Sequence, residues 1–424
     1  MSENVSKIAA PKQMKAPGWL NRKIRDTALG RLGWIEEESL TVEDSLGTVQ
    51  LGKNNASLQA TIRVHDLGTY REIAFRGALG GAEAYMNGGW STDDLTAVIR
   101  ILARNRDVFN TMNRSWAPFL NLGLGLYRGL RQNTRAGSRK NISAHYDLGN
   151  DFFQLFLDPT MTYSSGVFEE PEATMEEASR AKYHRIARKI ELSAEDHVLE
   201  IGSGWGGFAI FAAREYGCRV TTATISREQY QEATRRIAEA GLSDRIEVIE
   251  SDYRDLQGQY DKLVSIEMIE AVGSKNLGTF FRVCSERLKA HGRMALQAIT
   301  TPDQGYESHI RTTDFIQRYI FPGGELVSTG AVQRAIGTHT DMRTTHLEDL
   351  TRHYARTLQH WRTRFHENRD AIKGLGLDER FLRMWEYYLS YCEGGFAEDQ
   401  IGLLQMVFEK PLSRRAGVVQ SGSP

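Results

Sequence analysis

Four glycines lie within six positions of the segment VLEIGSGWGG, residues 198–207. Ahead of them, residues 198–201 are apolar apart from Glu200, which is typical of a buried strand that ends at the glycines. Glycine lets a loop turn tightly at a strand end and lets a ligand approach the main chain. Dinucleotides, nucleoside triphosphates and S-adenosylmethionine (SAM) are all bound by such loops. The segment therefore predicts a cofactor site and leaves the cofactor open.

The residues after the loop narrow that choice. No Gly-Lys-Ser/Thr ending follows, so a nucleoside triphosphate loop is excluded. Gly202, Gly204 and Gly207 do satisfy the Gly-x-Gly-x-x-Gly pattern of dinucleotide folds. However, the next apolar run, residues 219–224, ends without the carboxylate that such a site uses to bind ribose hydroxyls. A glycine turn with a structural role alone remains an alternative on this pattern.

From about Asp196 onward, apolar runs alternate with helix-length segments. This alternation predicts an α/β fold with a parallel, doubly wound sheet. The glycine loop follows the first strand and begins the first helix, which is the position of a nucleotide-binding loop. The predicted strands are residues 197–201, 219–224, 246–251, 262–266 and 293–299, and the predicted helices are residues 208–216, 228–239 and 276–289.

The first 110 residues alternate short β-like runs with glycine turns, which predicts a smaller α+β domain. The runs lie at residues 48–51, 60–64 and 72–75, and a glycine-rich patch follows at residues 77–81. Beyond it, WAPFLNLGLGLYRGLR (residues 116–131) is rich in leucine and aromatic residues and is followed by Arg and Lys. This segment is either an amphipathic element at a lipid interface or a buried connection between domains.

Length and composition support this organisation. A chain of 424 residues suggests two domains. We expect an N-terminal domain at residues 1–131, a linker at 132–140, a larger domain at 141–412 and a tail at 413–424. Cys218, Cys284 and Cys392 are far apart, which favours neither a metal cluster nor a disulfide framework. With no signal peptide and no apolar run near the ~20 residues of a membrane span, we expect a cytoplasmic protein.

Charge is distributed unevenly along the chain. The net charge is −1, yet residues 1–140 hold 20 Lys and Arg against 13 Asp and Glu. A basic front part suits an anionic partner, either nucleic acid or an anionic membrane surface. An imbalance of this size between domains is also common, so charge alone does not show that an anionic partner exists.

Several longer motifs carry a resemblance to a known family. VLEIGSGWGG followed by TISREQ resembles the SAM-binding region of the cyclopropane fatty acid synthases and mycolic acid methyltransferases. The similar blocks keep the family order across residues 141–410, and the N-terminal part is similar to the long bacterial form, which has an added lipid-binding domain. The other blocks are NISAHYDLGNDFFQLFLDPTMTYSSGVF (141–168), SIEMIEAVG (265–273), FIQRYIFPGG (315–324) and the residues around YCEGGF (388–408).

The resemblance implies a SAM site. Neutral hydrogen-bonding groups would replace the missing carboxylate at the ribose. The glycine loop would hold the methionine part of SAM, with adenine beside an Asp-Tyr pair and two tyrosines and a serine closing over the cofactor. The residues at these positions are Gly202, Gly204, Gly206, Thr224, Gln229, Asp252, Tyr253, Tyr146, Tyr163 and Ser164.

The implied reaction makes particular demands on a catalyst. Methyl transfer to a cis double bond of a lipid chain leaves a carbocation, so the site must exclude water, stabilise positive charge and then accept a proton. Aromatic faces attract cations, whereas a side-chain carboxylate against the cation is at risk of being trapped by it. The family resemblance implies a bound bicarbonate ion as base, held by Glu270, Gln297, Tyr319 and the backbone at Ser165 and Ile299.

Two of these positions depart from the commonest family pattern. Ser165 stands where many members have cysteine, and Gln297 where many have histidine. Glutamine can donate a hydrogen bond but cannot carry a proton. The product therefore stays open between a cyclopropane and a methylene or methyl-branched chain. Glu270 has the alternative of capping a helix near Ser274, and Glu267 is assigned neither to the cofactor nor to solvent.

The leading hypothesis is a SAM-dependent enzyme that methylates unsaturated acyl chains of membrane phospholipids to form cyclopropane fatty acids. It would associate peripherally with the anionic inner face of the membrane and bind neither metal nor nucleic acid; a homodimer is left open. One alternative is a non-catalytic lipid-binding protein with a relic SAM site. Another is a nucleic-acid methyltransferase, although the Pro-Pro-aromatic signature of many base methyltransferases is absent.

Overall fold

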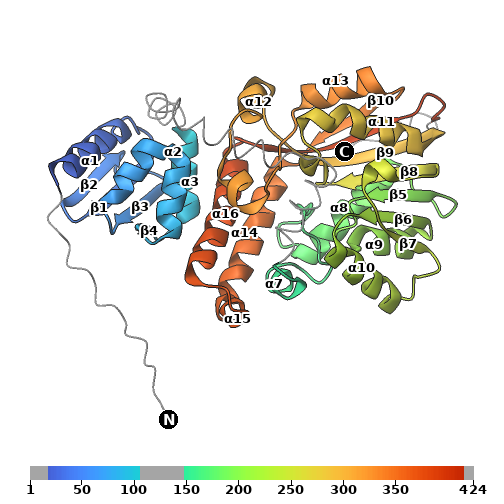
Figure 1. Cartoon of the computed structure of the whole chain (residues 1–424), viewed down its shortest axis with the longest axis horizontal. Coiled ribbons are helices and arrows are strands. Elements are labelled where there is room, and N and C mark those ends of the chain that lie inside the picture. Colours follow the sequence, from blue (N-terminus) through green and yellow to red (C-terminus); the bar gives the residue numbers. More distant parts are fainter. Residues whose placement is uncertain (1–17, 106–147, 415–424) are drawn as a thin grey trace, which may run out of the picture.

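The computed structural model describes residues 18–105 and 148–414, which contain a four-stranded and a seven-stranded sheet. Figure 1 shows the smaller sheet at one end of the molecule and the larger one at the other, with two long helices, α14 (Thr351–Glu367) and α16 (Glu379–Ala397), between them. Within these residues, no helix combines the length and apolar character that crossing a bilayer requires.

The N-terminal domain has strand order β2-β1-β3-β4. The strands predicted at residues 48–51 and 60–64 are confirmed, but the strand predicted at 72–75 is wrong, because these residues lie in helix α2. A short apolar run does not distinguish strand from helix by itself, and here packing of α2 against α1 and α16 decides. The elements are α1 (Trp19–Leu32), β1 (Ser39–Asp44), β2 (Gly47–Gly52), β3 (Gln59–Val64), α2 (Gly68–Met86), β4 (Trp90–Thr92) and α3 (Leu95–Arg104).

The glycine-rich patch predicted at residues 77–81 lies inside α2. Gly77 has φ of 56°, a value that glycine adopts without steric penalty, and the helix is kinked there. The segment at residues 116–131, the predicted linker at 132–140 and Tyr146 lie outside the described residues.

The larger sheet has strand order β10-β11-β9-β8-β5-β6-β7. Strands β5 to β9 are parallel, as the alternating pattern predicts. These five are the strands that the sequence predicts; β10 and β11 were not predicted, and β11 is antiparallel to both β9 and β10. The strands are β5 (His197–Ile201), β6 (Arg219–Thr224), β7 (Ile246–Glu250), β8 (Tyr260–Ile266), β9 (Leu288–Thr300), β10 (Arg343–Asp349) and β11 (Gly402–Glu409).

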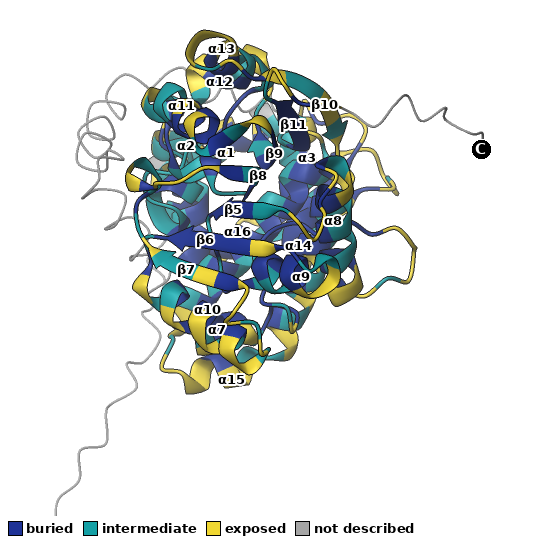
Figure 2. Ribbon diagram, turned by 90° about the vertical axis from the view of Figure 1, so that its right-hand side faces the viewer, coloured by how far each residue is buried: buried dark blue, intermediate teal, exposed yellow. Residues whose placement is uncertain are grey.

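Both faces of this sheet are covered by helices. Val198 and Val264 pack into one apolar cluster with α8, α9 and α10, whereas their chain neighbours, Leu199 and Leu263, pack into another with α11 and α13. Burial on both faces explains why the strands read as continuous apolar runs, and Figure 2 shows much of β5 and β6 as buried. The three predicted helices match α9 (Gly207–Tyr216), α10 (Arg227–Glu239) and α11 (Leu277–Arg287) to within about two residues; the others are α7 (Asn150–Gln154), α8 (Met175–Lys189), α12 (Asp303–His309), α13 (Thr329–His339) and α15 (Arg369–Gly374).

Helix α16 joins the two parts of the molecule. One continuous apolar cluster runs from the N-terminal sheet through α16 and α14 to Trp205 beside the glycine loop. Polar contacts add to it: Arg383 of α16 donates hydrogen bonds to the backbone carbonyls of Tyr85 and Trp90, and Arg100 of α3 forms an ion pair with Glu398. The N-terminal domain is therefore held in a defined position over the site described next.

Candidate active site

A cavity of about 950 Å³ opens at the carboxyl ends of the parallel strands. The glycine loop after β5 lines it, together with residues that end or follow β6, β7, β8 and β9. Ligands of open α/β sheets bind at this edge, because the loops there connect strands to helices on opposite faces. The cavity continues into the N-terminal domain, where residues such as Leu29, Val42 and Val98 line it.

The glycine loop gives this cavity a bare backbone wall. Gly202 and Gly204 have φ of 99° and 48° and line the cavity. A Cβ added at Gly204 would meet no atom within 4 Å, so the space beside it is open to a ligand. Gly206 does not line the cavity; with φ of 84° it begins α9, and a Cβ there would lie 3.4 Å from Ala233. Two of the three predicted glycines thus face the cavity, and the third shapes the turn.

The residues predicted to bind ribose and adenine lie along the same wall. Thr224 donates a 2.8 Å hydrogen bond from Oγ1 to Oε1 of Gln229, and both residues line the cavity. Asp252 accepts hydrogen bonds from Arg254. The buried hydroxyl of Tyr253 has no hydrogen-bond partner among the described residues. Buried polar atoms are nearly always paired, so this hydroxyl fits a ligand that supplies the missing partner, as SAM would.

Two of the three residues predicted to close over the cofactor are described, and both line the cavity. The hydroxyls of Tyr163 and Tyr388 share a hydrogen bond of 2.9 Å. Oγ of Ser164 accepts a 2.6 Å hydrogen bond from Nζ of Lys182. Tyr163 also packs near Trp361, with ring centroids 5.2 Å apart, so its ring is held by neighbours on several elements.

Glu270 and Ile299, both predicted to hold an anion, are in direct contact. The backbone N–H of Ile299 donates a 2.6 Å hydrogen bond to Oε1 of Glu270. Oε2 of Glu270 is buried and has no hydrogen-bond partner among the described residues. Burial, with the neighbouring charge of Glu267, raises the pKa of Glu270 to about 8. The alternative role of Glu270 as a helix cap receives no support, since the N–H of Ser274 donates a 2.7 Å hydrogen bond to Oε2 of Glu325 instead.

Ser165 and Gln297 meet a different group from the one predicted. The N–H of Ser165 and Nε2 of Gln297 donate hydrogen bonds of 3.0 and 2.7 Å to Oε1 of Glu267. The hydroxyl of Tyr354 donates one of 2.5 Å to Oε2 of the same carboxylate. Glu267 lines the cavity, whereas Ser165 and Gln297 do not. Both donors expected to hold bicarbonate are thus bonded to a side-chain carboxylate.

Tyr319 lies apart from the other four residues of the predicted anion site. Its hydroxyl donates a 2.7 Å hydrogen bond to Oε1 of Glu83, on α2 of the N-terminal domain. It does not line the cavity. The five predicted groups therefore do not surround one point: two meet at Glu270, two meet at Glu267, and Tyr319 contacts the other domain.

Sequence reasoning missed two charged residues of this site. Lys182 is fully buried; burial lowers its pKa to about 8, while Glu267, Asp158 and Glu200 raise it. Its signal is its position in the α8 sequence, four residues after Ala178 and four before Ile186, on the apolar face. Glu200 lines the cavity, and burial raises its pKa to about 8 against a hydrogen bond from Thr222.

The cavity wall therefore holds more acidic than basic groups near the glycine loop. Glu200, Glu267 and Glu270 line this part of the cavity, and the buried ammonium of Lys182 lies near Glu200 and Glu267. Rings of Tyr163, Tyr354, Tyr388, Phe321 and Phe396 line the same space. Carboxylates and aromatic faces both attract cations, so this environment suits a positively charged ligand or intermediate. No His, Cys, Asp and Glu side chains in the described ranges form a group that could hold a metal.

Comparison with known proteins agrees with this geometry. Residues 133–406 match the family model described as mycolic acid cyclopropane synthetase. The chain is 40% identical over 343 residues to tuberculostearic acid methyltransferase UfaA1 of Mycobacterium tuberculosis, covering 79% of each chain. It is 34% identical over 356 residues to cyclopropane-fatty-acyl-phospholipid synthase of Escherichia coli, covering 84% of this chain and 89% of the relative.

Solved structures are also similar to this chain and indicate the same family. Mycolic acid cyclopropane synthase CmaA1 complexed with SAH and CTAB superimposes with a TM-score of 0.61 at 31% identity, covering 64% of this chain and 98% of that one. Coclaurine N-methyltransferase, at 20% identity and a TM-score of 0.61, shares the fold. The glycine loop, the cavity beside it and these matches together show that the chain belongs to the mycolic acid cyclopropane synthetase family of SAM-dependent methyltransferases.

Proposed function

We propose that this protein transfers the methyl group of SAM to the cis double bond of unsaturated acyl chains of membrane phospholipids and forms cyclopropane fatty acids. One observation carries the proposal. A single cavity connects the glycine loop to the apolar interior of the N-terminal domain. A cofactor at one end and a long apolar chain at the other are the two occupants that such a space fits.

The N-terminal part of the cavity has the chemistry of an acyl-chain site. Its wall is formed by mostly apolar residues from α1, β1, β3, α2, β4 and α3, with no charged residue among those of residues 18–105 that line it. Burying methylene groups against such a wall is favourable by about 0.8 kcal/mol for each one. These lining residues are Ala28, Leu29, Leu32, Leu40, Val42, Ile62, Val64, Ile73, Ala78, Trp90, Val98, Ile99, Leu102 and Ala103, with Thr69, Tyr70, Gly77 and Gly81.

Each wall of the cavity has a role in the proposed reaction. SAM supplies an electrophilic methyl group. The glycine loop and the residues at Thr224 and Asp252 would bind the cofactor, and the apolar wall excludes water from the alkene. Tyr163, Tyr388 and the neighbouring rings lie where positive charge on the lipid chain would be stabilised.

A methylene or methyl-branched chain is the second candidate product. The relative at 40% identity is named a tuberculostearic acid methyltransferase, whereas the relative at 34% is named a cyclopropane synthase. Both products begin with the same methyl transfer and differ in which carbon loses a proton. Glu267 lines the cavity and accepts a hydrogen bond from Gln297, so we propose that these two residues influence which product forms.

Bicarbonate stays a prediction from the family resemblance. The N–H of Ile299 is bonded to Oε1 of Glu270, so Oε2 of Glu270, which has no partner among the described residues, would be the contact of bicarbonate on the cavity wall. The other expected donors, Ser165 and Gln297, are bonded to Glu267. Turnover measured with and without bicarbonate tests this part of the proposal.

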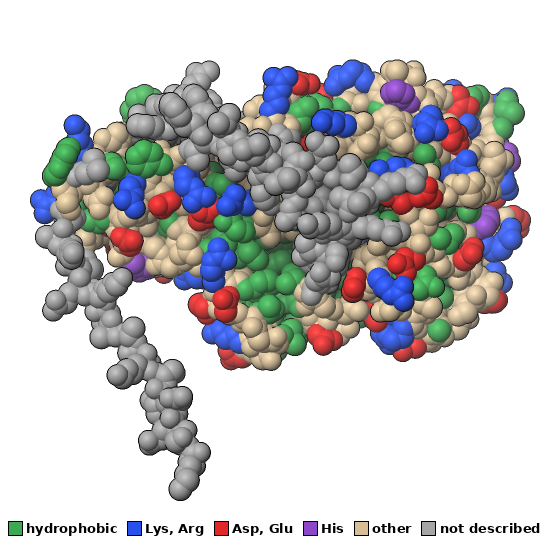
Figure 3. Space-filling model, in the orientation of Figure 1, with side chains coloured by type: hydrophobic (Ala, Val, Ile, Leu, Met, Phe, Trp, Pro, Cys, Tyr) green, Lys and Arg blue, Asp and Glu red, His purple; other side chains and the backbone are tan. Residues whose placement is uncertain are grey.

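We further propose peripheral binding to the inner face of an anionic membrane from the cytoplasm. Residues 18–105 hold ten Lys and Arg against eleven Asp and Glu, so the positive excess of residues 1–140 comes from the segments outside this range. The N-terminal domain instead exposes aromatic side chains: Trp19 is 75% exposed and Trp34 66%, and hydrophobic side chains lie on its surface in Figure 3. The domain boundaries at 131, 140 and 412 and a homodimer remain parts of this proposal.

Expression in a bacterium that lacks such enzymes tests the function. Gas chromatography–mass spectrometry of its fatty acids should show acyl chains one carbon heavier than the unsaturated parent. Ozonolysis then separates the products, because a methylene chain is cleaved and a cyclopropane resists. The Gly204→Val variant, expressed at the same level, is the control. An unchanged fatty-acid profile from the parent protein, with SAH binding intact, would refute the proposed function.

A further inference from the structure

We propose that the carboxylate of Glu267 is the proton acceptor of this reaction and takes the place of a bound bicarbonate ion. The inference rests on the proposed function. It concerns a residue whose side chain lies on the cavity wall between Glu270 and the ring of Tyr354, at the end of β8.

Three donors hold the carboxylate from three separate parts of the chain. Oε1 of Glu267 accepts from the N–H of Ser165 and from Nε2 of Gln297, and Oε2 accepts from the hydroxyl of Tyr354. A bound anion would need these donors for itself. Since Glu267 already engages them, the anion of this site is part of the protein.

The Gln297 amide has a fixed orientation, which makes this contact unambiguous. Nζ of Lys189, which can only donate, bonds Oε1 of Gln405 at 2.5 Å. The Gln405 amide must then donate from Nε2 to Oε1 of Gln297, at 2.8 Å. Nε2 of Gln297 is thereby turned toward Glu267. The series of bonds begins at a lysine and ends at a carboxylate, so every amide in it has one favourable direction.

The backbone of Glu267 has a strained conformation, which is frequent at functional sites. Its φ is 50°, in the left-handed region that residues other than glycine seldom adopt. The N–H of Glu267 donates a 2.8 Å hydrogen bond to the carbonyl of Gln297, so Gln297 holds both the backbone and the side chain of this residue. The strained conformation directs the carboxylate to its three donors.

Of the two neighbouring glutamates, Glu267 is the one suited to carry the charge. It receives three hydrogen bonds and lies near the ammonium of Lys182, whereas Glu270 receives one, from Ile299. Burial raises the pKa of both carboxyl groups, and that of Glu270 reaches about 8. Two adjacent buried carboxylates do not both ionise readily. The three donors and the nearby ammonium therefore assign the negative charge of the pair to Glu267 and the proton to Glu270.

The proposed step balances within the lipid chain and this side chain. The alkene π pair forms the bond to the methyl carbon, the C–S pair leaves with sulfur, and positive charge remains on the adjacent chain carbon. The new methyl group then gives a proton to the Glu267 carboxylate, and the released C–H pair closes the ring. Three hydrogen bonds from separate parts of the chain fix the position of the carboxylate, which restrains it from moving onto the cationic carbon. Oε2 accepts only the bond from Tyr354 and so keeps a lone pair for the proton.

Isosteric and deletion variants test this assignment in bicarbonate-free buffer, with vesicles of dioleoylphosphatidylglycerol as substrate. The parent should turn over equally with and without added bicarbonate. Glu267→Gln, which keeps the volume but not the charge, should bind SAH normally and lose roughly 10²–10⁴-fold in turnover. Glu270→Gln is the matched control and should lose much less, because that carboxyl group is already neutral.

A rescue experiment adds a readout that a structural role would not give. Glycine suits φ of 50°, so Glu267→Gly should fold and should leave the donors of Ser165, Gln297 and Tyr354 open. Added bicarbonate or formate should then restore turnover to that variant and raise its Tm, with no effect on either quantity for the parent. A parent that needs bicarbonate, or a Glu267→Gln variant with full activity, would overturn the assignment. A parent that makes no product under any condition would instead overturn the proposed function on which the assignment rests.

Discussion

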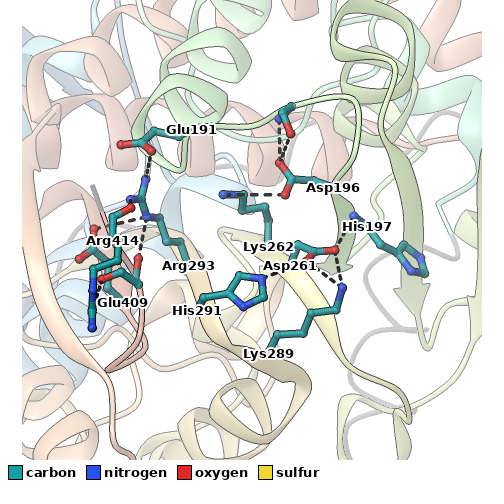
Figure 4. A network of polar contacts seen from close by, with 12 residues as sticks. Glu191, Asp196, His197, Asp261, Lys262, Lys289, His291, Arg293, Glu409 and Arg414 are labelled. Atoms are coloured by element: carbon teal, nitrogen blue, oxygen red, sulfur yellow. Dashed lines mark hydrogen bonds and ion pairs between the residues drawn. The ribbon is translucent and has the colours of Figure 1, made fainter. Parts of the chain in front are cut away.

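The two edges of the seven-stranded sheet treat acidic residues in opposite ways. At the carboxyl ends of the strands, Glu200, Glu267 and Glu270 line a cavity, and burial raises the pKa of each. At the amino ends, Figure 4 shows a network in which each acidic side chain faces a cation or a donor. The same sheet thus has one edge with buried carboxyl groups of raised pKa and one edge with carboxylates that form ion pairs.

Asp261 and Arg293 show what pairing does at the amino ends. Burial acts to raise the pKa of Asp261, but hydrogen bonds from Lys289 and from the N–H of His197 bring it below its usual range. Arg293, only 3% exposed, pairs with Glu191 at 2.7 Å and lies 3.5 Å from Glu409. These contacts tie β5, β8, β9 and β11 together where no ligand is expected.

The comparison separates stability from function within one sheet. Carboxylates with their own cations stabilise the fold, whereas carboxylates beside a cavity are poised for a cationic ligand and for proton transfer. The sulfonium of SAM and a carbocation on a lipid chain are both cations that the carboxyl-end edge would stabilise. Matched substitutions at the two edges test this division between stability and function.

The largest expected effect comes from removing one lysine at each edge. Lys182→Met takes the ammonium from a fully buried cluster, so the free energy of unfolding should fall by about 3–5 kcal/mol. Lys289→Met, whose side chain is 39% exposed, should lower it by about 0–1 kcal/mol. Urea denaturation of both variants measures the difference. Equal losses of unfolding free energy would mean that the lysines at the two edges contribute equally to stability, contrary to this division.

The next effect concerns the glycine loop. Gly204→Val should weaken SAH binding about 100-fold, because the branched side chain enters the ligand space and strains a left-handed residue. Gly241→Val is the matched control at the other edge: Gly241 also has positive φ, 68°, and a Cβ there would likewise meet no atom within 4 Å. Calorimetry should find normal SAH affinity in the control. Weakened binding in both variants would assign the effect to backbone strain instead of ligand contact.

Stability should depend on pH with opposite sign at the two edges. The pKa of Glu200 in the folded protein, about 8, exceeds its unfolded value near ~4.3, so its favourable contribution is complete below ~4.3 and is lost as pH rises toward 8. Glu200→Gln should therefore flatten a decline of at least about 1 kcal/mol across that range. Unfolding free energies measured at several pH values between 4 and 8 would check it.

Asp261→Asn provides the contrast. The pKa of Asp261 lies below its unfolded value near ~3.9, so its contribution is present above ~3.9 and is lost as pH falls through the folded pKa. The variant should be destabilised by about 1 kcal/mol at pH 7 and by little at pH 2. If both variants changed stability with the same pH trend, the proposed division between the edges would be wrong.

The smallest effect is expected at Gln297. Histidine keeps a hydrogen-bond donor toward Glu267, so Gln297→His should change turnover by less than about 10-fold and leave SAH binding unchanged. Gln297→Leu, of similar size but without a donor, is the comparison variant and should lose more activity. A Gln297→His protein as impaired as Gln297→Leu would argue against a donor role for this position.

Local patterns determined most of the larger domain. Strands β5 and β6 begin and end at the predicted residues, and α9 follows the glycine loop, because apolar runs and glycines act over a few neighbouring positions. Prediction was poorer where packing between distant elements decided the outcome. The run at residues 72–75 became helix under contacts from α1 and α16, and β11 entered the sheet in the antiparallel direction after a helical excursion of about fifty residues between β10 and β11.

The site divides in the same way. The sequence by itself determined the family and predicted that the glycine loop, Thr224, Gln229 and Tyr253 share a site; these residues line one cavity, and they were predictable because they depend on contiguous motifs. Only the tertiary structure decided what Ser165 and Gln297 bind, and that Tyr319 turns to Glu83. The partners of Glu267 lie 102, 30 and 87 residues away along the chain. No local pattern records such distances, because tertiary packing, and not chain neighbourhood, brings those groups together and sets the environment of the carboxylate.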